Sequence, residues 1–349
     1  MERFTLAPGA EISRVIRGGW QLAGGHGAVD TARAVEDLIA AADAGITTFD
    51  CADIYTGVED IMGAFRTEYA RRRGDEAAGA IRIHTKCVPD LARLGSLTRA
   101  DIEAMIDASL RRLKTERIDL VQFHWWDYEA PGWLEAATWL AELQRAGKID
   151  LLGGTNFDTG HMLEMLEAGV PLSTMQVQYS LLDRRPHAAM VAAATMHDVH
   201  LLCYGTVAGG FLSDRWLGVP EPAEPLENRS LVKYKLIIDD AGGWDAFQTL
   251  LSAVREVADA TESDIATVAS RAVLEWDRVA AVIVGARNAE HLAKNLAIGA
   301  LELTARQRAA VDYAAQELTP IAGDVYTLER DRTGPHGAIM KYNLNADAV

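Results

Sequence analysis

Short runs of apolar, β-branched residues alternate along the chain with longer segments whose apolar residues recur at helical spacing. This alternation predicts strand–helix units. In the first unit, SRVIRGG (13–19) predicts a strand, and DTARAVEDLIAAADAG (30–45) predicts a helix that Asp30 caps and Gly45 ends. Further strands are predicted at residues 46–52, 80–86, 117–124, 149–156, 172–180, 199–205 and 278–286.

Helical patterns follow these strands, at residues 58–73, 97–114, 131–148, 161–169, 187–198, 244–260, 263–276, 289–299 and 303–318. The rhythm breaks once, after the seventh strand. Residues 213–243 contain three prolines and the Gly242–Gly243 pair, so we interpret them as a long inserted loop. Residues 320–349 carry scattered glycines and predict an irregular tail.

Repeated strand–helix units imply a parallel sheet. Eight of them within 349 residues favour a closed (β/α)8 TIM barrel, formed as a single domain over residues 1–349 with one extra helix. The alternative is an open Rossmann-type sheet, which needs a G-x-G-x-x-G turn after its first strand. Neither Gly18–Gly19 nor GGHG (24–27) provides that spacing.

Composition excludes several classes of protein. With 34 basic and 50 acidic residues the formal charge is −16, which argues against nucleic-acid binding. No apolar run approaches the roughly 20 residues of a membrane helix. We see no secretory signal, and the three cysteines (Cys51, Cys87 and Cys203) form neither a disulfide framework nor a metal-binding spacing. A cytoplasmic protein without a metal site is therefore expected.

In a TIM barrel, functional groups lie at the carboxyl ends of the strands. Four candidates for catalysis stand there: Asp50, Tyr55, Lys86 and His124. A lysine ammonium beside a tyrosine favours the phenolate, and a carboxylate keeps that lysine charged. The histidine can hydrogen-bond a substrate oxygen. The set is suited to delivering a proton to an oxygen atom.

Two other interpretations of these residues remain at this point. Each of them taken alone could be structural, as a turn cap, a solvated charge or a satisfied polar group. An isomerase could also use Lys86 or His124 as its base, and such an enzyme would bind no nicotinamide.

Seven segments, in order, resemble those of the aldo-keto reductase superfamily. They are TFDCADIY (48–55), IHTK (83–86), VQFHWWD (121–127), GTNFD (154–158), MQVQYSLLDRR (175–185), LLCYGTVAGGFLSDR (201–215) and VIVGARNAEHLAKNL (282–296). The resemblance implies the same barrel with its C-terminal tail over the rim. It also implies reversible reduction of an aldehyde or ketone by hydride from a nicotinamide, with Tyr55 as general acid, Lys86 and Asp50 tuning it, and His124 orienting the carbonyl.

The resemblance also implies where the cofactor binds. Asn156 and Gln176 would hydrogen-bond the carboxamide, Tyr204 would stack on the nicotinamide, and Gly205 through Leu212 would approach the pyrophosphate. NADP(H) is favoured because Arg287 and the start of the following helix could hold the 2′-phosphate; NAD(H) stays possible because His291 stands where many relatives have arginine. The full set is Gly19, Trp20, Asn156, Gln176, Tyr204, Gly205, Gly209, Gly210, Leu212, Gly285, Arg287, His291 and Asn295.

The substrate pocket is the least defined part of the prediction. We expect Trp20, Trp125 and Trp126 to wall it, with His26 as a further candidate. The tail adds Tyr326, Arg330, Arg332 and Tyr342. The partner would be a small carbonyl or alcohol substrate, and the oligomeric state stays open. The alternative function is a cofactor-binding regulatory subunit with the same barrel and little turnover.

Overall fold

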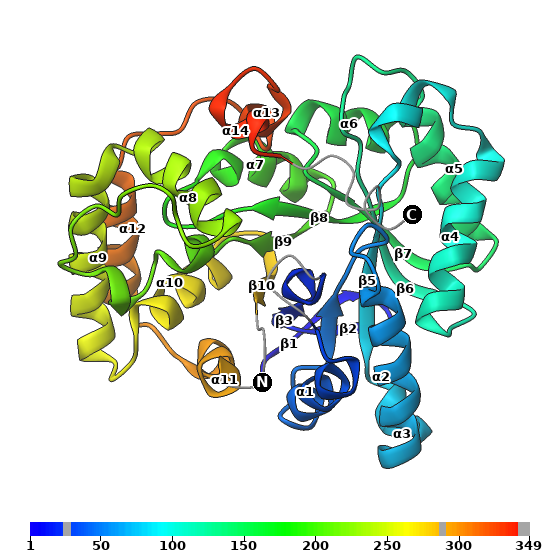
Figure 1. The fold of residues 1–349 in the computed structure, drawn as a ribbon, viewed down its shortest axis with the longest axis horizontal. Coiled ribbons are helices and arrows are strands. Elements are labelled where there is room, and N and C mark those ends of the chain that lie inside the picture. Colours follow the sequence, from blue (N-terminus) through cyan, green and yellow to red (C-terminus); the bar gives the residue numbers. More distant parts are fainter. Residues whose placement is uncertain (24–28, 286–290, 341–349) are drawn as a thin grey trace.

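A closed barrel of parallel strands forms the centre of the protein (Figure 1). The computed structural model describes residues 1–23, 29–285 and 291–340. Around the barrel the strands follow the order β10-β3-β4-β5-β6-β7-β8-β9, and every neighbouring pair is parallel. They are β3 (Val15–Gly18), β4 (Thr48–Asp50), β5 (Arg82–Cys87), β6 (Ile118–Phe123), β7 (Ile149–Thr155), β8 (Leu172–Gln178), β9 (His200–Tyr204) and β10 (Val279–Gly285).

Helices surround these strands (Figure 1). They are α1 (Thr31–Asp43), α2 (Val58–Arg73), α3 (Asp75–Gly79), α4 (Arg99–Leu113), α5 (Trp133–Arg145), α6 (Thr159–Glu167), α7 (Ala189–Met196), α8 (Arg229–Asp240), α9 (Gly243–Ala260), α10 (Ile265–Leu274), α11 (Leu292–Ala300), α12 (Ala305–Gln316), α13 (Thr327–Arg330) and α14 (Pro335–Ala338). The predicted (β/α)8 TIM barrel is thus confirmed. Among the described residues, no helix has both the length and the apolar character of a membrane span.

Local sequence signals set several helix boundaries. The Asp30 side chain accepts a hydrogen bond from the Arg33 amide at the start of α1, and Gly45 follows its end with a φ of 101°. A capping box between Thr98 and Asp101 begins α4. The predicted roles of Asp30 and Gly45 at the two ends of α1 are thus confirmed.

An N-terminal hairpin, which the hydrophobic pattern did not predict, closes the amino end of the barrel. Strands β1 (Arg3–Ala7) and β2 (Ala10–Ser13) pair in antiparallel fashion. Their Leu6 and Ile12 pack in one cluster with Ile16 and Leu120 of the barrel strands. The hairpin therefore buries apolar interior side chains at the end opposite the strand carboxyl ends.

The prediction that residues 213–243 form a loop is wrong for residues 229–240, which form α8. The prolines of the segment all precede this helix, and the Asn228 side chain caps it by accepting from the Leu231 amide. Leu231, Tyr234, Ile237 and Ile238 then form a buried face at helical spacing. The helix packs against the short turn Ala208–Gly210 that follows β9.

The C-terminal tail lies over the carboxyl rim of the barrel, as predicted. It is partly regular rather than irregular, because it contains the short helices α13 and α14. Arg185, in the segment after β8, forms a bidentate ion pair with Glu329 of α13, and both side chains are 1% exposed. This pair anchors the tail, so that Tyr326, Ile339 and Met340 line the pocket described next.

Candidate active site

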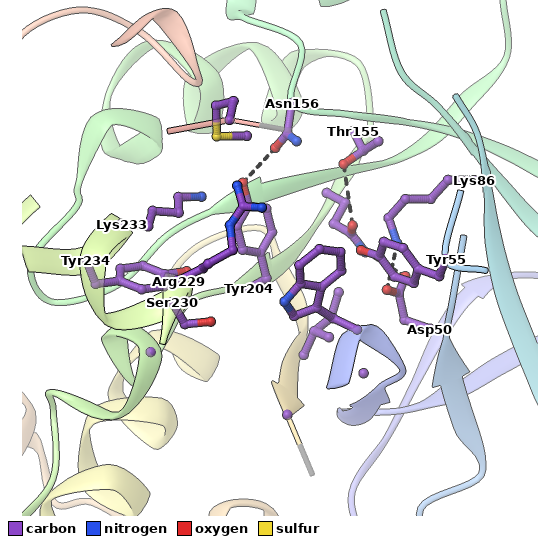
Figure 2. A pocket seen from close by; sticks show the side chains of 18 of the residues that line it. Asp50, Tyr55, Lys86, Thr155, Asn156, Tyr204, Arg229, Ser230, Lys233 and Tyr234 are labelled. Atoms are coloured by element: carbon purple, nitrogen blue, oxygen red, sulfur yellow. Dashed lines mark hydrogen bonds and ion pairs between the residues drawn. The ribbon is translucent and has the colours of Figure 1, made fainter. Parts of the chain in front are cut away.

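A cavity of about 560 Å³ lies at the carboxyl ends of the barrel strands. The predicted strand-end residues meet in it: its lining includes Asp50, Tyr55, Lys86, His124, Asn156, Gln176, Tyr204, Gly205, Gly209 and Gly285. Figure 2 shows the first three on one side of the cavity and residues of α8 on the other. Among the described residues, no group of three His, Cys, Asp or Glu side chains is placed to hold a metal ion.

Asp50 and Lys86 form a buried ion pair at the ends of β4 and β5. The Lys86 Nζ donates to Asp50 Oδ2 (2.7 Å) and to the Cys51 carbonyl oxygen (2.8 Å). The amides of Gln122 and Gln176 donate to Asp50 Oδ1 (3.0 and 2.8 Å). Burial opposes the charge on Lys86, but the Asp50 carboxylate outweighs burial and raises the lysine pKa to about 12. The ammonium is therefore present at neutral pH.

Tyr55 lies beside this pair and presents a protonated phenol to the pocket. The Lys86 Nζ is 5.2 Å from the centre of the Tyr55 ring, and Trp20 packs edge-on against that ring at 5.1 Å. Burial raises the pKa of Tyr55, and the Lys86 ammonium offsets only part of that rise. The lysine does favour the phenolate, as the sequence argument holds, but burial has the larger effect and the net pKa of Tyr55 is raised.

His124 is buried and neutral, and the residue belongs to the pocket lining. Its Nδ1 lies 3.0 Å from the Thr155 carbonyl oxygen, which can only accept, so Nδ1 carries the proton. Burial, with repulsion from Arg330, lowers the pKa of the ring to about 3. Nε2 makes no hydrogen bond to a described residue and is therefore an acceptor. An acceptor nitrogen can take a hydrogen bond from a substrate hydroxyl group, but it cannot donate one to a substrate carbonyl oxygen.

This neutral ring predicts a pH dependence of stability. In the folded protein the pKa of His124 is lowered to about 3 from an ordinary value of 6.5. The neutral ring therefore makes its full contribution to the free energy of unfolding at any pH above 6.5. It is lost as pH falls toward 3, because the unfolded chain binds the proton first. Between pH 7 and 4.5, we expect urea unfolding to show wild type losing roughly 2 kcal/mol more than His124→Gln. Equal losses in both proteins would contradict the burial of a neutral ring.

Asn156 and Tyr204 form a second polar group on the pocket wall. The Tyr204 hydroxyl donates to Asn156 Oδ1 at 2.8 Å. Asn156 has a φ of 61°, and the guanidinium of Arg330 donates to its carbonyl oxygen at 2.8 Å. The Arg330 guanidinium also donates to the Trp125 carbonyl oxygen and stacks over Tyr128 at 3.8 Å. The tail thus holds Asn156 in a conformation that few non-glycine residues adopt.

The loop after β9 brings backbone close to α8. Gly205 and Gly209 have φ values of 78° and 64°, and a Cβ on either would lie within 3 Å of Tyr234. Gly210 lies outside the pocket lining, and the Leu212 side chain packs in the apolar cluster that includes Leu231 of α8. Only glycine allows this loop and helix to approach so closely.

Two other predicted glycines have steric roles at the strand ends. The Gly19 amide donates to the Asp50 carbonyl oxygen (2.7 Å), and a Cβ there would lie 2.9 Å from that oxygen. Gly19 does not line the pocket. Gly285 does, and a Cβ there would collide with Gln21.

Of the predicted tryptophan walls, Trp20 and Trp126 line the pocket and Trp125 does not. The prediction for Trp125 is wrong: its side chain is fully buried, and its Nε1 donates to the Ala130 carbonyl oxygen. Trp126 packs edge-on against His124 at 4.4 Å. Successive side chains leave a chain on different sides, so only one of the pair reaches the cavity.

Two of the residues predicted for the far end of the cofactor, His291 and Asn295, do not line this cavity. His291 is exposed at the start of α11, and Asn295 is largely buried on that helix, outside the pocket lining. Arg287, His26 and Tyr342 lie outside the described residues.

Several lining residues were not among the predicted site residues: Thr155, Arg229, Ser230, Tyr234, Ile339 and Met340. The sequence prediction placed Lys233 only within the inserted loop at residues 213–243. The signal that could have found the α8 group is the apolar spacing from Leu231 to Ile238, which predicts a helix once the prolines are seen to precede it.

The cavity fits a nicotinamide dinucleotide by its chemistry. Asn156 and Gln176 carry amides that can pair with a carboxamide, and Tyr204 offers an aromatic face. Gly205 and Gly209 line the same cavity, as does His124, whose Nε2 makes no hydrogen bond to a described residue.

Comparison with known proteins agrees with this geometry. The sequence profile of the Aldo/keto reductase family matches residues 14–316. The chain is 33% identical over 222 residues to an aldo-keto reductase of Bacillus subtilis (strain 168), covering 62% of this chain and 65%, just under two thirds, of that relative. It is 27% identical over 329 residues to the L-glyceraldehyde 3-phosphate reductase of Escherichia coli (strain K12), covering 89% of this chain and 91% of the relative. The solved structure of a glycerol dehydrogenase from Gluconobacter oxydans shares the fold, with a TM-score of 0.75, 24% identity and coverage of 90% and 94% of the two chains.

Proposed function

Because the chain belongs to the aldo/keto reductase family, we propose that it reduces an aldehyde or ketone to an alcohol, reversibly, with NADP(H) as its preferred cofactor. The observation that carries the proposal is one pocket lined by a protonated Tyr55, the buried Asp50–Lys86 pair and His124, whose Nε2 has no hydrogen-bond partner among the described residues. This set can give a proton to a substrate oxygen and hold the hydroxyl that results.

When bound, the dinucleotide supplies a hydride to the carbonyl carbon. In this proposal Asn156 and Gln176 would bind its carboxamide, and Tyr204 would offer its aromatic face to the nicotinamide ring. Gln176 donates its amide N–H to Asp50, and its Oε1 accepts a long hydrogen bond from Thr155 Oγ1 (3.4 Å), so the second lone pair of Oε1 is the acceptor for a carboxamide N–H. The hydrogen bond from the Tyr204 hydroxyl to Asn156 Oδ1 fixes the position of the tyrosine ring relative to the asparagine amide.

Tyr55 donates its phenolic proton to the carbonyl oxygen as the C–H bond forms. The Lys86 ammonium, 5.2 Å from the ring centre, stabilises the phenolate that remains. Asp50 keeps that ammonium charged and directed. His124 accepts a hydrogen bond from the new hydroxyl through Nε2, so it orients the alcohol in both directions of the reaction.

The proposed preference for NADPH rests on Arg287 and is tested by its removal. Arg287→Met should weaken NADPH binding by about tenfold or more and leave NADH binding unchanged, because only NADPH carries the 2′-phosphate. Lys294→Met is the matched control, since Lys294 is paired with Asp264 at 2.8 Å. Titration by tryptophan fluorescence measures both. Equal loss for the two cofactors would remove Arg287 from the phosphate site.

The proposal places this reaction in the cytoplasm. Cys51, Cys87 and Cys203 are all free and buried, as expected where thiols stay reduced. The partner is a small carbonyl or alcohol substrate, and it binds between the strand ends, α8 and the tail.

A further inference from the structure

Helix α8 brings two cations to the pocket. Among the described residues, the charged side chains that line the cavity are Asp50, Lys86, Arg229 and Lys233. Asp50 and Lys86 neutralise each other as an ion pair. The remaining charges are both positive and both come from α8, in a chain whose formal charge is −16. The α8 side of the pocket is therefore positively charged, although the protein as a whole is acidic.

Lys233 has no anionic partner within the described residues. Its Nζ makes no ion pair or hydrogen bond to a described residue, and it lies 5.2, 5.5 and 6.0 Å from the ring centres of Tyr204, Tyr234 and Tyr326. Burial lowers the pKa of this ammonium. The two carboxylates that raise its pKa, Glu329 and Asp183, are both paired with Arg185. The ammonium is thus half-buried among aromatic rings and has no paired carboxylate among the described residues.

This cation lies across the cavity from Tyr55, beside two aromatic rings that contact other proposed site residues. The Tyr326 ring that it contacts also packs edge-on against His124, at 5.7 Å between ring centres. The Tyr204 ring is hydrogen-bonded to Asn156. Figure 2 shows Lys233 and Arg229 entering from the α8 side, facing the side that holds Tyr55.

We propose that Lys233, with Arg229 beside it, binds a carboxylate or phosphate group of the carbonyl substrate, so that the pocket selects acidic aldehydes or ketones. The proposal rests on the function proposed above. It assigns the anion to the substrate because Lys233 contacts Tyr204, the proposed partner of the nicotinamide ring, which carries no anionic group. The cofactor phosphates are expected instead along Gly209 and Gly210 and at Arg287.

The test compares 4-carboxybenzaldehyde with 4-methylbenzaldehyde in wild type and Lys233→Met. The variant should raise KM for the carboxylate by about tenfold or more, with KM for the methyl compound, kcat and NADPH affinity unchanged. The matched control is Lys235→Met, because the Lys235 ammonium is paired with Glu221 and Asp239. Equal losses for both aldehydes together with weaker NADPH binding would assign Lys233 to the cofactor and overturn the proposal.

A binding measurement separates this proposal from the function on which it rests. Benzoate and benzamide differ in charge but little in shape, and Trp20 and Trp126 in the lining report their binding by fluorescence. Wild type should bind benzoate about tenfold or more tightly than benzamide, and Lys233→Met should lose the difference. That result without turnover of either aldehyde would support the anion site and contradict the reductase. No preference in wild type would overturn the anion site.

Discussion

Tyr55→Phe is expected to lower kcat for carbonyl reduction by roughly three orders of magnitude, because it removes the proposed proton donor. The Tyr55 hydroxyl makes no hydrogen bond to a described residue, and its ring contacts with Trp20 and Lys86 do not need the hydroxyl. The free energy of unfolding and the affinity for NADPH should therefore stay close to wild type. Steady-state rates at 340 nm and cofactor titration measure the two effects.

The matched control for this variant is Tyr69→Phe. Tyr69 is a buried tyrosine on α2 and does not line the pocket, so the loss of its hydroxyl should leave turnover unchanged. Unchanged turnover in Tyr55→Phe would remove Tyr55 as the acid. Cofactor binding in wild type with negligible turnover of any aldehyde would favour the regulatory-subunit alternative.

Arg185→Met should lower the free energy of unfolding by about 3–5 kcal/mol, the usual effect of removing one partner from a buried ion pair. The Arg185 side chain is 1% exposed and binds both Asp183 and Glu329, which are equally buried. Burial alone would raise the pKa of Glu329, but the Arg185 guanidinium lowers it to about 2. The variant leaves two buried carboxylates without their cation.

Urea unfolding at neutral pH measures this loss. Arg215→Met is the control, because Arg215 and Glu227 form an exposed pair, with side chains 60% and 62% exposed. Its unfolding free energy should be essentially unchanged. An equally small change in Arg185→Met would mean that the tail is held by its other contacts, such as those of Arg330.

The strand-end residues could be predicted because parallel strands of a barrel deliver their last side chains to a single rim. The Asp50–Lys86 contact follows from that geometry, although 36 residues separate the pair in sequence. The pKa of Tyr55 could not be predicted in the same way. That pKa depends on how completely the surrounding residues bury the phenol, and the spacing of residues in the sequence does not predict the extent of this burial.

The parts that sequence reasoning missed depend on long-range packing. Helix α8 faces the β9 loop through Tyr234, and its prediction failed because nearby prolines obscured a short apolar face. The anchor between Arg185 and Glu329 spans 144 residues, so no local pattern signals it. Trp125 and Trp126 have the same local composition, and the backbone after β6 decides which of them reaches the cavity.

The most direct test of the central claim is hydride transfer from stereospecifically deuterated NADPH. Wild-type protein is incubated with each of the two 4-deuterated forms and 4-carboxybenzaldehyde or 4-methylbenzaldehyde, and the alcohol is analysed by mass spectrometry. The account predicts that one form transfers deuterium to the carbinol carbon and the other transfers hydrogen, because the pocket fixes one face of the nicotinamide. Failure of NADPH and NADH to bind, or alcohol without deuterium from both forms, would contradict it.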